Sequence, residues 1–242
     1  MPTTAERSAL GALALTAAHA GPALCAWSPG LRRRVGVRDH TADRRSVALT
    51  FDDGPHRHGT PATLEILNAA RVRATFFLVG EQVLRHPAVA AEIAAAGHDV
   101  GVHCERHRSL LRLTPAQTRD DLARAEDIIA RATGRAPCLY RPPYGVLSTA
   151  ALVQARRRGW TTVLWARWGR DWRARATPDT IVADAAGGLR GGEVVLLHDA
   201  DHYSAPGSWE RTVAALPRIV EAVGAAGLRC GPVRPARGET AR

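Results

Sequence analysis

The sequence predicts an α/β fold, a distorted (β/α) barrel with about seven parallel strands, and three observations support it. From residue 46 onward, short apolar or β-branched runs alternate with longer Ala-, Leu- and Arg-rich stretches of helical period. The 242 residues are enough for one large domain with one core. Polar residues follow the apolar runs directly, where parallel barrels build their sites from the loops after the strands.

Seven segments are expected to form the strands. They are residues 46–51, 74–79, 99–103, 138–141, 161–165, 193–198 and a weaker segment near Leu228. Three helices are expected to begin with a hydroxyl N-cap followed by proline, at Thr60-Pro61, Thr114-Pro115 and Thr177-Pro178.

The chain divides into three expected regions. Residues 1–45 form a hydrophobic and basic N-terminal segment, residues 46–233 the barrel, and residues 234–242 a disordered tail. The stretch from Ala9 to Trp27 is rich in Ala and Leu but contains His19, Gly21 and Pro22, so a secretory signal, a membrane anchor and a plain helix all stay open. Localisation stays open with it, between a secreted or membrane-associated protein and a cytoplasmic one.

The net charge and the cysteine spacing exclude several classes of protein but do not identify a function. The formal net charge is +10, but the arginines are scattered, without interleaved aromatic residues or a nucleic-acid module. We therefore expect a solvated basic surface and no nucleic-acid partner, while contact with a membrane surface or an anionic cell-wall polymer stays open. The four cysteines form no CxxC pair, which excludes a zinc ribbon and a thioredoxin-like motif, although two disulfides would be compatible with the count.

Two carboxylates follow the first expected strand directly. Residues 47–51 lead into Asp52-Asp53-Gly54-Pro55, so adjacent like charges stand at a tight turn. Aspartate and glycine also close ordinary turns, and this run alone leaves a structural turn and a functional site equally open.

Two imidazoles follow the third expected strand. His103 and His107 lie four residues apart, a spacing that brings both side chains to one side of a turn or helix. Two histidines and a carboxylate are a common zinc environment that leaves a position open for water or substrate. Since the chain has ten histidines, a chance pair is the alternative.

Polar residues also follow the later strands. The prolines after Arg141 stiffen a loop from which this arginine can orient a carboxylate, while a main-chain N–H near Tyr144 can face a developing oxyanion. Asp171-Trp172 pairs an acid with an aromatic ring, and His198 ends the sixth strand. Such signals at successive strand ends favour one catalytic site over several unrelated structural roles.

These motifs, in this order, resemble those of the NodB-like polysaccharide deacetylases, carbohydrate esterase family four. The resemblance covers about residues 46–232. The family blocks stand at residues 50–54 (TFDDG), 103–107 (His-x-x-x-His), 141–144 (Arg-x-Pro-Tyr), 171–172 (Asp-Trp) and 196–198 (Leu-x-His).

The resemblance implies a metal-dependent hydrolase that removes N-acetyl groups from an amino-sugar glycan or oligosaccharide. It implies that a divalent metal, usually zinc with cobalt or nickel as substitutes, is held by Asp53, His103 and His107. It also implies that Asp52 is the general base, positioned by Arg141. His198 would be the general acid, with its acidity tuned by Asp171. The amide of Tyr144 would stabilise the oxyanion, and Trp172 and Leu196 would form the walls of the acetyl pocket.

The sequence departs from the family at Cys104, where a Ser or Thr hydroxyl normally steadies the loop. A thiol is a weaker hydrogen-bond donor than a hydroxyl. We expect Cys104 simply to take the place of the Ser or Thr, and capture of the metal by the thiol is the alternative. The family block that ends in Asp-Trp matches this sequence only in its final pair, Asp171-Trp172.

Other functions stay open beside N-deacetylation. They are an O-acetyl ester deacetylase, a deacetylase of a small metabolite, and a catalytically silent carbohydrate-binding homologue. We expect a monomer whose partner is an acetylated carbohydrate. The segment 199–209 adjoins His198, and we expect it to shape the substrate groove through Tyr203 and Trp209.

Overall fold

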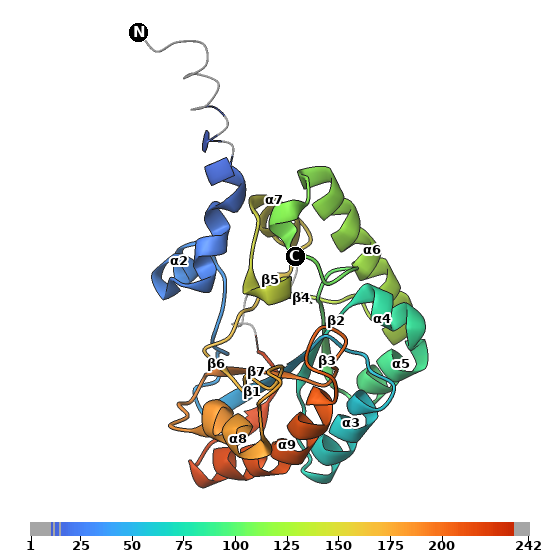
Figure 1. Ribbon diagram of the computed structural model, residues 1–242, viewed down its shortest axis with the longest axis vertical. Coiled ribbons are helices and arrows are strands. Elements are labelled where there is room, and N and C mark those ends of the chain that lie inside the picture. The colour runs from blue at the N-terminus through green and yellow to red at the C-terminus, as the bar shows by residue number, and fades with distance from the viewer. Residues whose placement is uncertain (1–10, 12, 15, 235–242) are drawn as a thin grey trace.

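The computed structural model describes residues 11, 13–14 and 16–234, and its centre is a parallel sheet. The strands are β1 (Ser46–Asp52), β2 (Thr75–Leu78), β3 (Asp99–Val102), β4 (Leu139–Tyr140), β5 (Thr161–Thr162), β6 (Arg167–Trp168), β7 (Val194–His198) and β8 (Arg229–Gly231). The order is β5-β4-β3-β2-β1-β7-β6, and β8 pairs with residues 46–48 of β1. Figure 1 shows the sheet enclosed by helices, which confirms the predicted distorted (β/α) barrel.

Strand β1 is the centre of the sheet, with β2 and β7 paired along its edges. Every residue of β1 is buried, because helices cover the sheet, and most of the strand is apolar. The seven expected strands are all present within a few residues. Strand β6 was not predicted; it is two residues long and half-exposed, and it pairs with β7 at one end of the strand order.

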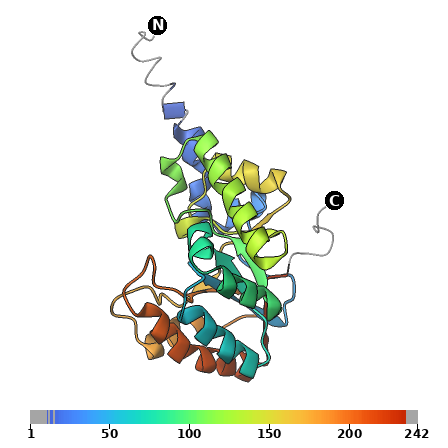
Figure 2. The same cartoon turned by 90° about the vertical axis from the view of Figure 1, so that its right-hand side faces the viewer.

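The helices form the outer layer. They are α3 (Gly59–Ala69), α4 (Gly80–Arg85), α5 (Pro87–Ala95), α6 (Pro115–Thr133), α7 (Thr149–Arg157), α8 (Pro178–Ala186) and α9 (Ser208–Ala225), with 3-10 turns η2 (Leu110–Arg112) and η3 (Pro143–Gly145). Helix α6 buries Leu122, Ala125 and Ile129, which recur at helical spacing and so form one apolar face. Figure 2 shows α3, α5 and α6 side by side on one flank of the barrel.

Two of the three expected helix starts are confirmed. Thr114 caps α6 and Thr177 caps α8, each in a capping box. The expected cap at Thr60 is wrong: the N-cap of α3 is His58 and the helix begins at Gly59, two residues earlier than expected. The Thr60 hydroxyl instead accepts a hydrogen bond from the His56 N–H and donates one to the buried carboxylate of Asp199, so a tertiary contact took the place of the cap.

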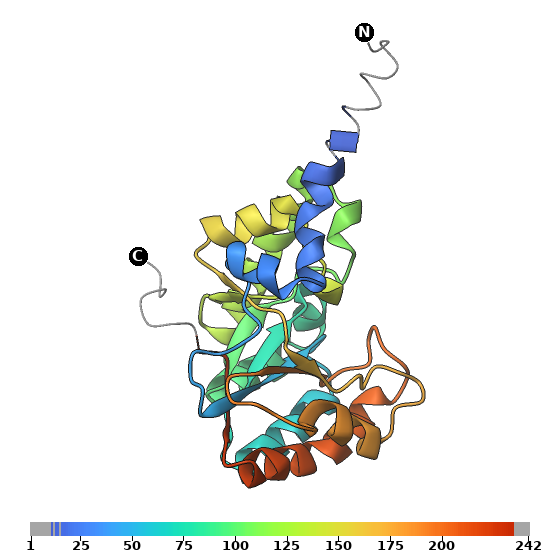
Figure 3. The same cartoon turned by 90° about the vertical axis from the view of Figure 1, so that its left-hand side faces the viewer.

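The N-terminal segment packs against the open side of the sheet. After η1 (Gly21–Ala26) and α2 (Pro29–Arg34), residues 38–40 bridge to Val163, directly after the edge strand β5, and to Glu193, directly before β7. Figure 3 shows η1 and α2 next to α7. Among the described residues, none of the helices is long and apolar enough for a membrane span. Residues 1–10, 12 and 15 of the expected signal or anchor, and residues 235–242 of the expected tail, lie outside the described residues.

The four cysteines all lie in the described part of the chain, and all are free thiols. The two disulfides that the count would permit are therefore not formed in this structure.

Candidate metal centre and catalytic site

The predicted site residues come together at the carboxyl end of the sheet. Asp52 ends β1 and lies in register with His198, which ends β7. His103 follows β3 and Arg141 follows β4, on the other side of β1. Because all these strands are parallel, their ends meet at one rim.

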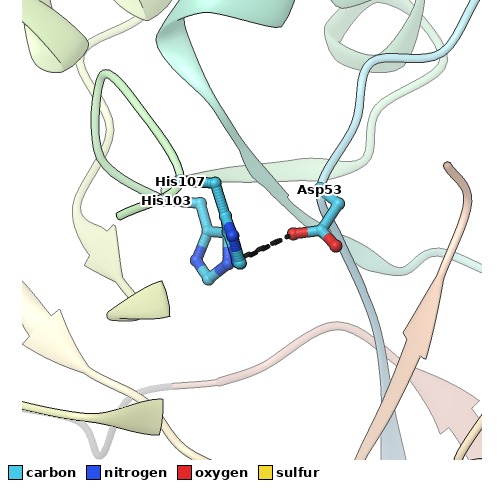
Figure 4. A group of neighbouring side chains, drawn as sticks. All are labelled: Asp53, His103 and His107. Atoms are coloured by element: carbon cyan, nitrogen blue, oxygen red, sulfur yellow. Dashed lines mark ion pairs between the residues drawn. The ribbon is translucent and has the colours of Figure 1, made fainter. Parts of the chain in front are cut away.

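Asp53, His103 and His107 form a compact group of metal-ligating atoms, the Asp-His-His triad (Figure 4). Oδ1 of Asp53 lies 3.5 Å from Nε2 of His103 and 3.4 Å from Nε2 of His107. Donors bound tetrahedrally to zinc at 2.0–2.2 Å would be about 3.4 Å apart. The same Asp53 oxygen is buried and has no hydrogen-bond partner among the described residues. These side chains therefore fit a divalent cation.

The charge states of the triad suit a cation as well. Burial opposes ionisation of Asp53, but the imidazoles of His103, His198 and His107 outweigh it and hold its pKa below the usual range. Burial lowers the pKa of His107 to about 4, which leaves this imidazole neutral near pH 7. A carboxylate and a neutral imidazole both offer the free lone pairs that metal binding requires.

Neighbouring groups fix the orientation of both histidine rings of the triad. Nδ1 of His103 lies 2.7 Å from the carbonyl oxygen of Arg141, so its N–H donates there and Nε2 faces Asp53. The ring of His107 stacks on Tyr203 at 4.4 Å between centroids and meets Tyr144 edge-on at 4.5 Å. Tyr203 is anchored in turn by Glu81 and Gln82 of α4.

Cys104 lies between the two histidines but faces away from the triad. Its side chain belongs to the hydrophobic core, with Sγ 4.0 Å from Oη of Tyr140, and burial raises the pKa of the thiol. The loop is steadied instead by Asp121, which accepts hydrogen bonds from the Glu105 N–H at 2.8 Å and from Nη2 of Arg108 at 3.0 Å.

Asp52 is oriented by a buried arginine. Nη1 of Arg141 lies 2.7 Å from Oδ1 of Asp52 and also donates to the hydroxyl of Thr50. The guanidinium is completely buried, donates to two main-chain carbonyls, and packs 4.1 Å from the ring centre of Phe77. With Oδ1 engaged, Oδ2 of Asp52 faces Nε2 of His103 at 3.8 Å.

His198 is paired with a second buried carboxylate. Nδ1 of His198 lies 2.8 Å from Oδ1 of Asp171, and Oδ2 of Asp171 accepts from the His198 main-chain N–H and from the Thr212 hydroxyl. Burial disfavours the charged imidazole, but Asp171 outweighs it and raises the pKa of His198 to about 10. Nε2 of His198 is thereby directed at the triad, 3.9 Å from Oδ2 of Asp53.

The remaining expected substrate residues surround this centre. The Trp172 ring lies edge-on to His198 at 5.6 Å. Leu196 is buried in β7 two residues before His198, so the two side chains point to the same face of the sheet. Tyr144 has a left-handed backbone (φ 60°) and is 60% exposed, which turns its ring out over the site.

Several supporting residues were not predicted. They are Phe77 under Arg141, Thr212 behind Asp171, Asp121 under the His103–His107 loop, and Asp199. Burial raises the pKa of Asp199 to about 7, and its carboxylate lies so close to Gly54 that a side chain there would meet it at 2.8 Å. Of the two aromatic residues expected to shape the groove, Tyr203 contacts His107, whereas Trp209 packs on His56, in the loop before α3.

Known proteins are similar to this chain in sequence and in fold. Residues 39–163 match the polysaccharide deacetylase family. A chitooligosaccharide deacetylase of Bradyrhizobium sp. (strain ANU 289) is 36% identical over 213 residues, 84% of this chain and 94% of the relative. A peptidoglycan-N-acetylglucosamine deacetylase of Bacillus cereus is 35% identical over 188 residues, 77% of this chain and 66% of the relative.

A solved structure is also similar to this chain in fold. The family 4 carbohydrate esterase from Streptomyces lividans, in complex with acetate, superimposes with a TM-score of 0.72 at 33% identity and covers 81% of this chain and 97% of its own. The family match and the Asp-His-His triad together indicate a divalent-metal site. The resemblance seen in the sequence is confirmed, and this chain belongs to the polysaccharide deacetylase family.

Proposed function

We propose that this protein is a hydrolase that removes N-acetyl groups from the amino sugars of a glycan, with zinc as the divalent metal in the Asp-His-His triad. One observation carries the proposal. Two acid–base groups flank the triad, and each is fixed by a buried partner of opposite charge, Asp52 by Arg141 and His198 by Asp171. Such a pair suits a reaction that takes a proton from water on one side and gives one to an amine on the other.

The proposed reaction divides the work between these groups. Asp53, His103 and His107 would hold the divalent metal, which would supply Lewis acidity toward the acetyl carbonyl and would lower the pKa of water to about 7. Oδ2 of Asp52 takes the proton as the water oxygen attacks the carbonyl carbon, because Oδ1 is engaged by Arg141. The main-chain N–H of Tyr144 stabilises the oxyanion.

The leaving group defines the role of His198. An amide nitrogen is too basic to depart as an anion, so Nε2 of His198 protonates it while the C–N bond breaks, and acetate and a free sugar amine result. The raised pKa of His198 keeps this proton in place near neutral pH. Trp172 and Leu196 wall the pocket for the acetyl methyl group. The names of the two relatives, which act on chitooligosaccharides and on peptidoglycan N-acetylglucosamine, support an acetylated amino sugar as the substrate.

Acetate release tests the proposal. The substrates are chitooligosaccharides, peptidoglycan fragments and acetylated xylan, each with chelator and after addition of zinc. We expect release from the N-acetylated substrates that stops on chelation and returns with zinc. Release from xylan alone would identify an ester deacetylase, and activity that survives exhaustive chelation would contradict the metal assignment.

Two variants separate the adjacent carboxylates. Asp53→Ala should lose both zinc and activity. Asp52→Asn should keep one zinc per chain while kcat falls by about 10²- to 10⁴-fold, the usual contribution of a general base. Equal loss of zinc in both variants would mean that the two roles are reversed.

A further inference from the structure

Asp199 is a buried carboxylate that the proposed reaction does not use. It directly follows His198, which ends β7, and its side chain is completely buried. One of its oxygens, Oδ2, accepts a hydrogen bond from the Thr60 hydroxyl on α3. The other, Oδ1, is buried and has no hydrogen-bond partner among the described residues. Burial of a carboxylate with so few partners is costly, so a specific role is needed to explain it.

The Asp199 carboxylate packs face-on against Gly54, the residue after the proposed metal ligand Asp53. A Cβ atom at position 54 would lie 2.8 Å from each of the two carboxylate oxygens. Such a distance is too short for a side chain, so this close approach requires glycine. The side chain of Asp199 therefore contacts the turn that carries the metal ligand.

The turn after β1 must be held in place, because Asp53 has a left-handed backbone. Its φ is 75°, which is unfavourable for a residue other than glycine and persists only where the surrounding structure enforces it. On the β2 side, the carbonyl of Gly54 accepts a hydrogen bond from the Val79 N–H at 3.0 Å. On the β7 side, the Asp199 carboxylate packs on Gly54. These two contacts restrain the turn from opposite sides of β1.

Asp199 also continues the connection between β1 and β7 beyond the end of their pairing. The last pair in register is Asp52 with His198. Past this pair, the Thr60 hydroxyl accepts from the His56 N–H at 2.8 Å and donates to Asp199. The loop between β1 and α3 is thus tied to the residue after β7 at both of its ends.

We propose that Asp199 is a positioning residue, which fixes the metal ligand Asp53 relative to the proposed acid His198. These two groups follow adjacent strands, and Nε2 of His198 lies 3.9 Å from Oδ2 of Asp53. A shift of the turn would change this distance and the geometry of the triad together. The inference rests on the proposed function and adds to it a residue that acts through Asp53.

Removal of the carboxylate should weaken metal binding. We expect Asp199→Ala to weaken zinc binding by about 10- to 100-fold, the usual effect of removing a group that orients a metal ligand. At saturating zinc, kcat should also fall. KM for a chitooligosaccharide should stay within about twofold, because the side chain is buried and its removal takes away no substrate contact. Competition with a fluorescent chelator and acetate release measure the two effects.

Asp199→Asn separates position from charge. Asparagine has nearly the same shape as aspartate, and its side-chain oxygen can still accept from the Thr60 hydroxyl. Zinc affinity should therefore stay within about threefold of that of the unaltered protein, since the orienting contact is kept. Equal weakening in Asp199→Asn and Asp199→Ala would mean that the negative charge itself attracts the metal, and the positioning role would be overturned.

Helix α3 offers a matched pair of variants. Thr60→Val removes the hydroxyl that donates to Asp199 and keeps the branched shape of the side chain. Thr63→Val makes the same change three residues later, where the hydroxyl is also buried but has no hydrogen-bond partner in the described part of the chain. Thr60→Val should weaken zinc binding about tenfold, and Thr63→Val less than about twofold. Equal effects in the two variants would contradict the proposal.

A double variant tests the contact with Gly54. Gly54→Ala places a methyl group against the carboxylate and should displace the turn, so zinc binding should weaken by at least about tenfold. In that background Asp199→Ala removes the clash and should cost less zinc affinity than in the unaltered protein, because the two residues are coupled. Fold-changes that simply multiply would show that Asp199 does not act on the turn.

A failure of the proposed function can be told apart from a failure of this role. If the unaltered protein binds zinc but releases no acetate, N-deacetylation is contradicted, and the zinc affinities alone decide the role of Asp199. If the unaltered protein binds no zinc, the metal assignment of the triad is wrong and the role proposed for Asp199 is overturned with it.

Discussion

Nη1 of Arg141 lies 2.7 Å from Oδ1 of Asp52, and the guanidinium is completely buried beneath the site. A buried charge is tolerated only where its hydrogen-bonding groups are satisfied. Arg141 meets this condition through Asp52, the Thr50 hydroxyl and the carbonyls of Val163 and Leu164. The arginine thus supports both the fold and the orientation of the proposed base.

Arg141→Met should therefore impair stability and turnover together. Removal of one partner of a buried ion pair leaves the other charge uncompensated, so we expect the free energy of unfolding to fall by about 3–5 kcal/mol. We expect kcat to fall as well, because Asp52 loses its fixed orientation. Denaturant unfolding and acetate release measure the two effects. The control is Arg131→Met on α6, whose partner Asp127 is as exposed as the arginine itself, and there the change should stay below about 1 kcal/mol. A stability loss no larger than that of the control would contradict this account of Arg141.

Asp171→Asn should change the pH dependence of turnover. The neighbouring carboxylate is what raises the pKa of His198 to about 10, against the effect of burial. With a neutral amide in its place, the imidazole loses its proton at lower pH. The basic limb of the kcat–pH profile should accordingly move to lower pH. A basic limb that stays where it is in the unaltered protein would exclude His198 as the proton donor.

The same pair should make stability depend on pH, with a definite sign. A group whose pKa is raised on folding stabilises the folded state fully below its unfolded pKa, about 6.5 for histidine, and this contribution is lost as pH rises towards the folded value. The stability difference between the unaltered protein and Asp171→Asn should thus be largest below pH 6.5 and shrink towards pH 10. Unfolding at a series of pH values measures it, and a difference that grew with pH would contradict the assignment.

Tyr203 should act on the metal through His107. Its ring stacks on this imidazole, and its hydroxyl is held by Glu81 and Gln82. Residues that orient a metal ligand typically change affinity by about 10- to 100-fold when removed, so Tyr203→Ala should weaken zinc binding by that order. Tyr203→Phe keeps the stacked ring and should weaken it less. Competition with a fluorescent chelator gives both affinities, and equal affinities in the two variants would show that the stacked ring does not orient His107.

Cys104 should prove irrelevant to metal binding. Its thiol is buried in the core and faces Tyr140, not the triad. Cys104→Ala should keep the zinc affinity within about threefold, since removal of a residue that orients a metal ligand typically costs about tenfold or more. In the folded protein an alkylating reagent should modify the exposed Cys138 and spare Cys104, as mass spectrometry can show. A large loss of zinc affinity, or rapid alkylation of Cys104, would place the thiol at the metal.

The sequence by itself determined seven of the eight strands in the described part of the chain, the order of the site residues, and the starts of α6 and α8. Residues 47–51 form a mostly apolar, β-branched and aromatic run that predicts a buried strand, and the capping box at Thr114 is a contact between near neighbours. Asp53, His103 and His107 could be picked out because each follows a recognisable strand, and parallel strands bring their ends to one rim.

The tertiary structure decided what depends on segments far apart in the chain. Strand β6 is formed by its pairing with β7. The Thr60 hydroxyl donates a hydrogen bond to Asp199 and does not cap its own helix. Tyr203 stacks on His107 although the two residues are nearly a hundred positions apart in the chain. A cavity of about 1190 Å³ likewise forms where residues 26–44 meet Tyr144, Trp165 and Trp168. Hydrophobic periodicity and capping are local and can be read along the chain, whereas stacking, ion pairing and cavity formation depend on which distant groups the fold brings together.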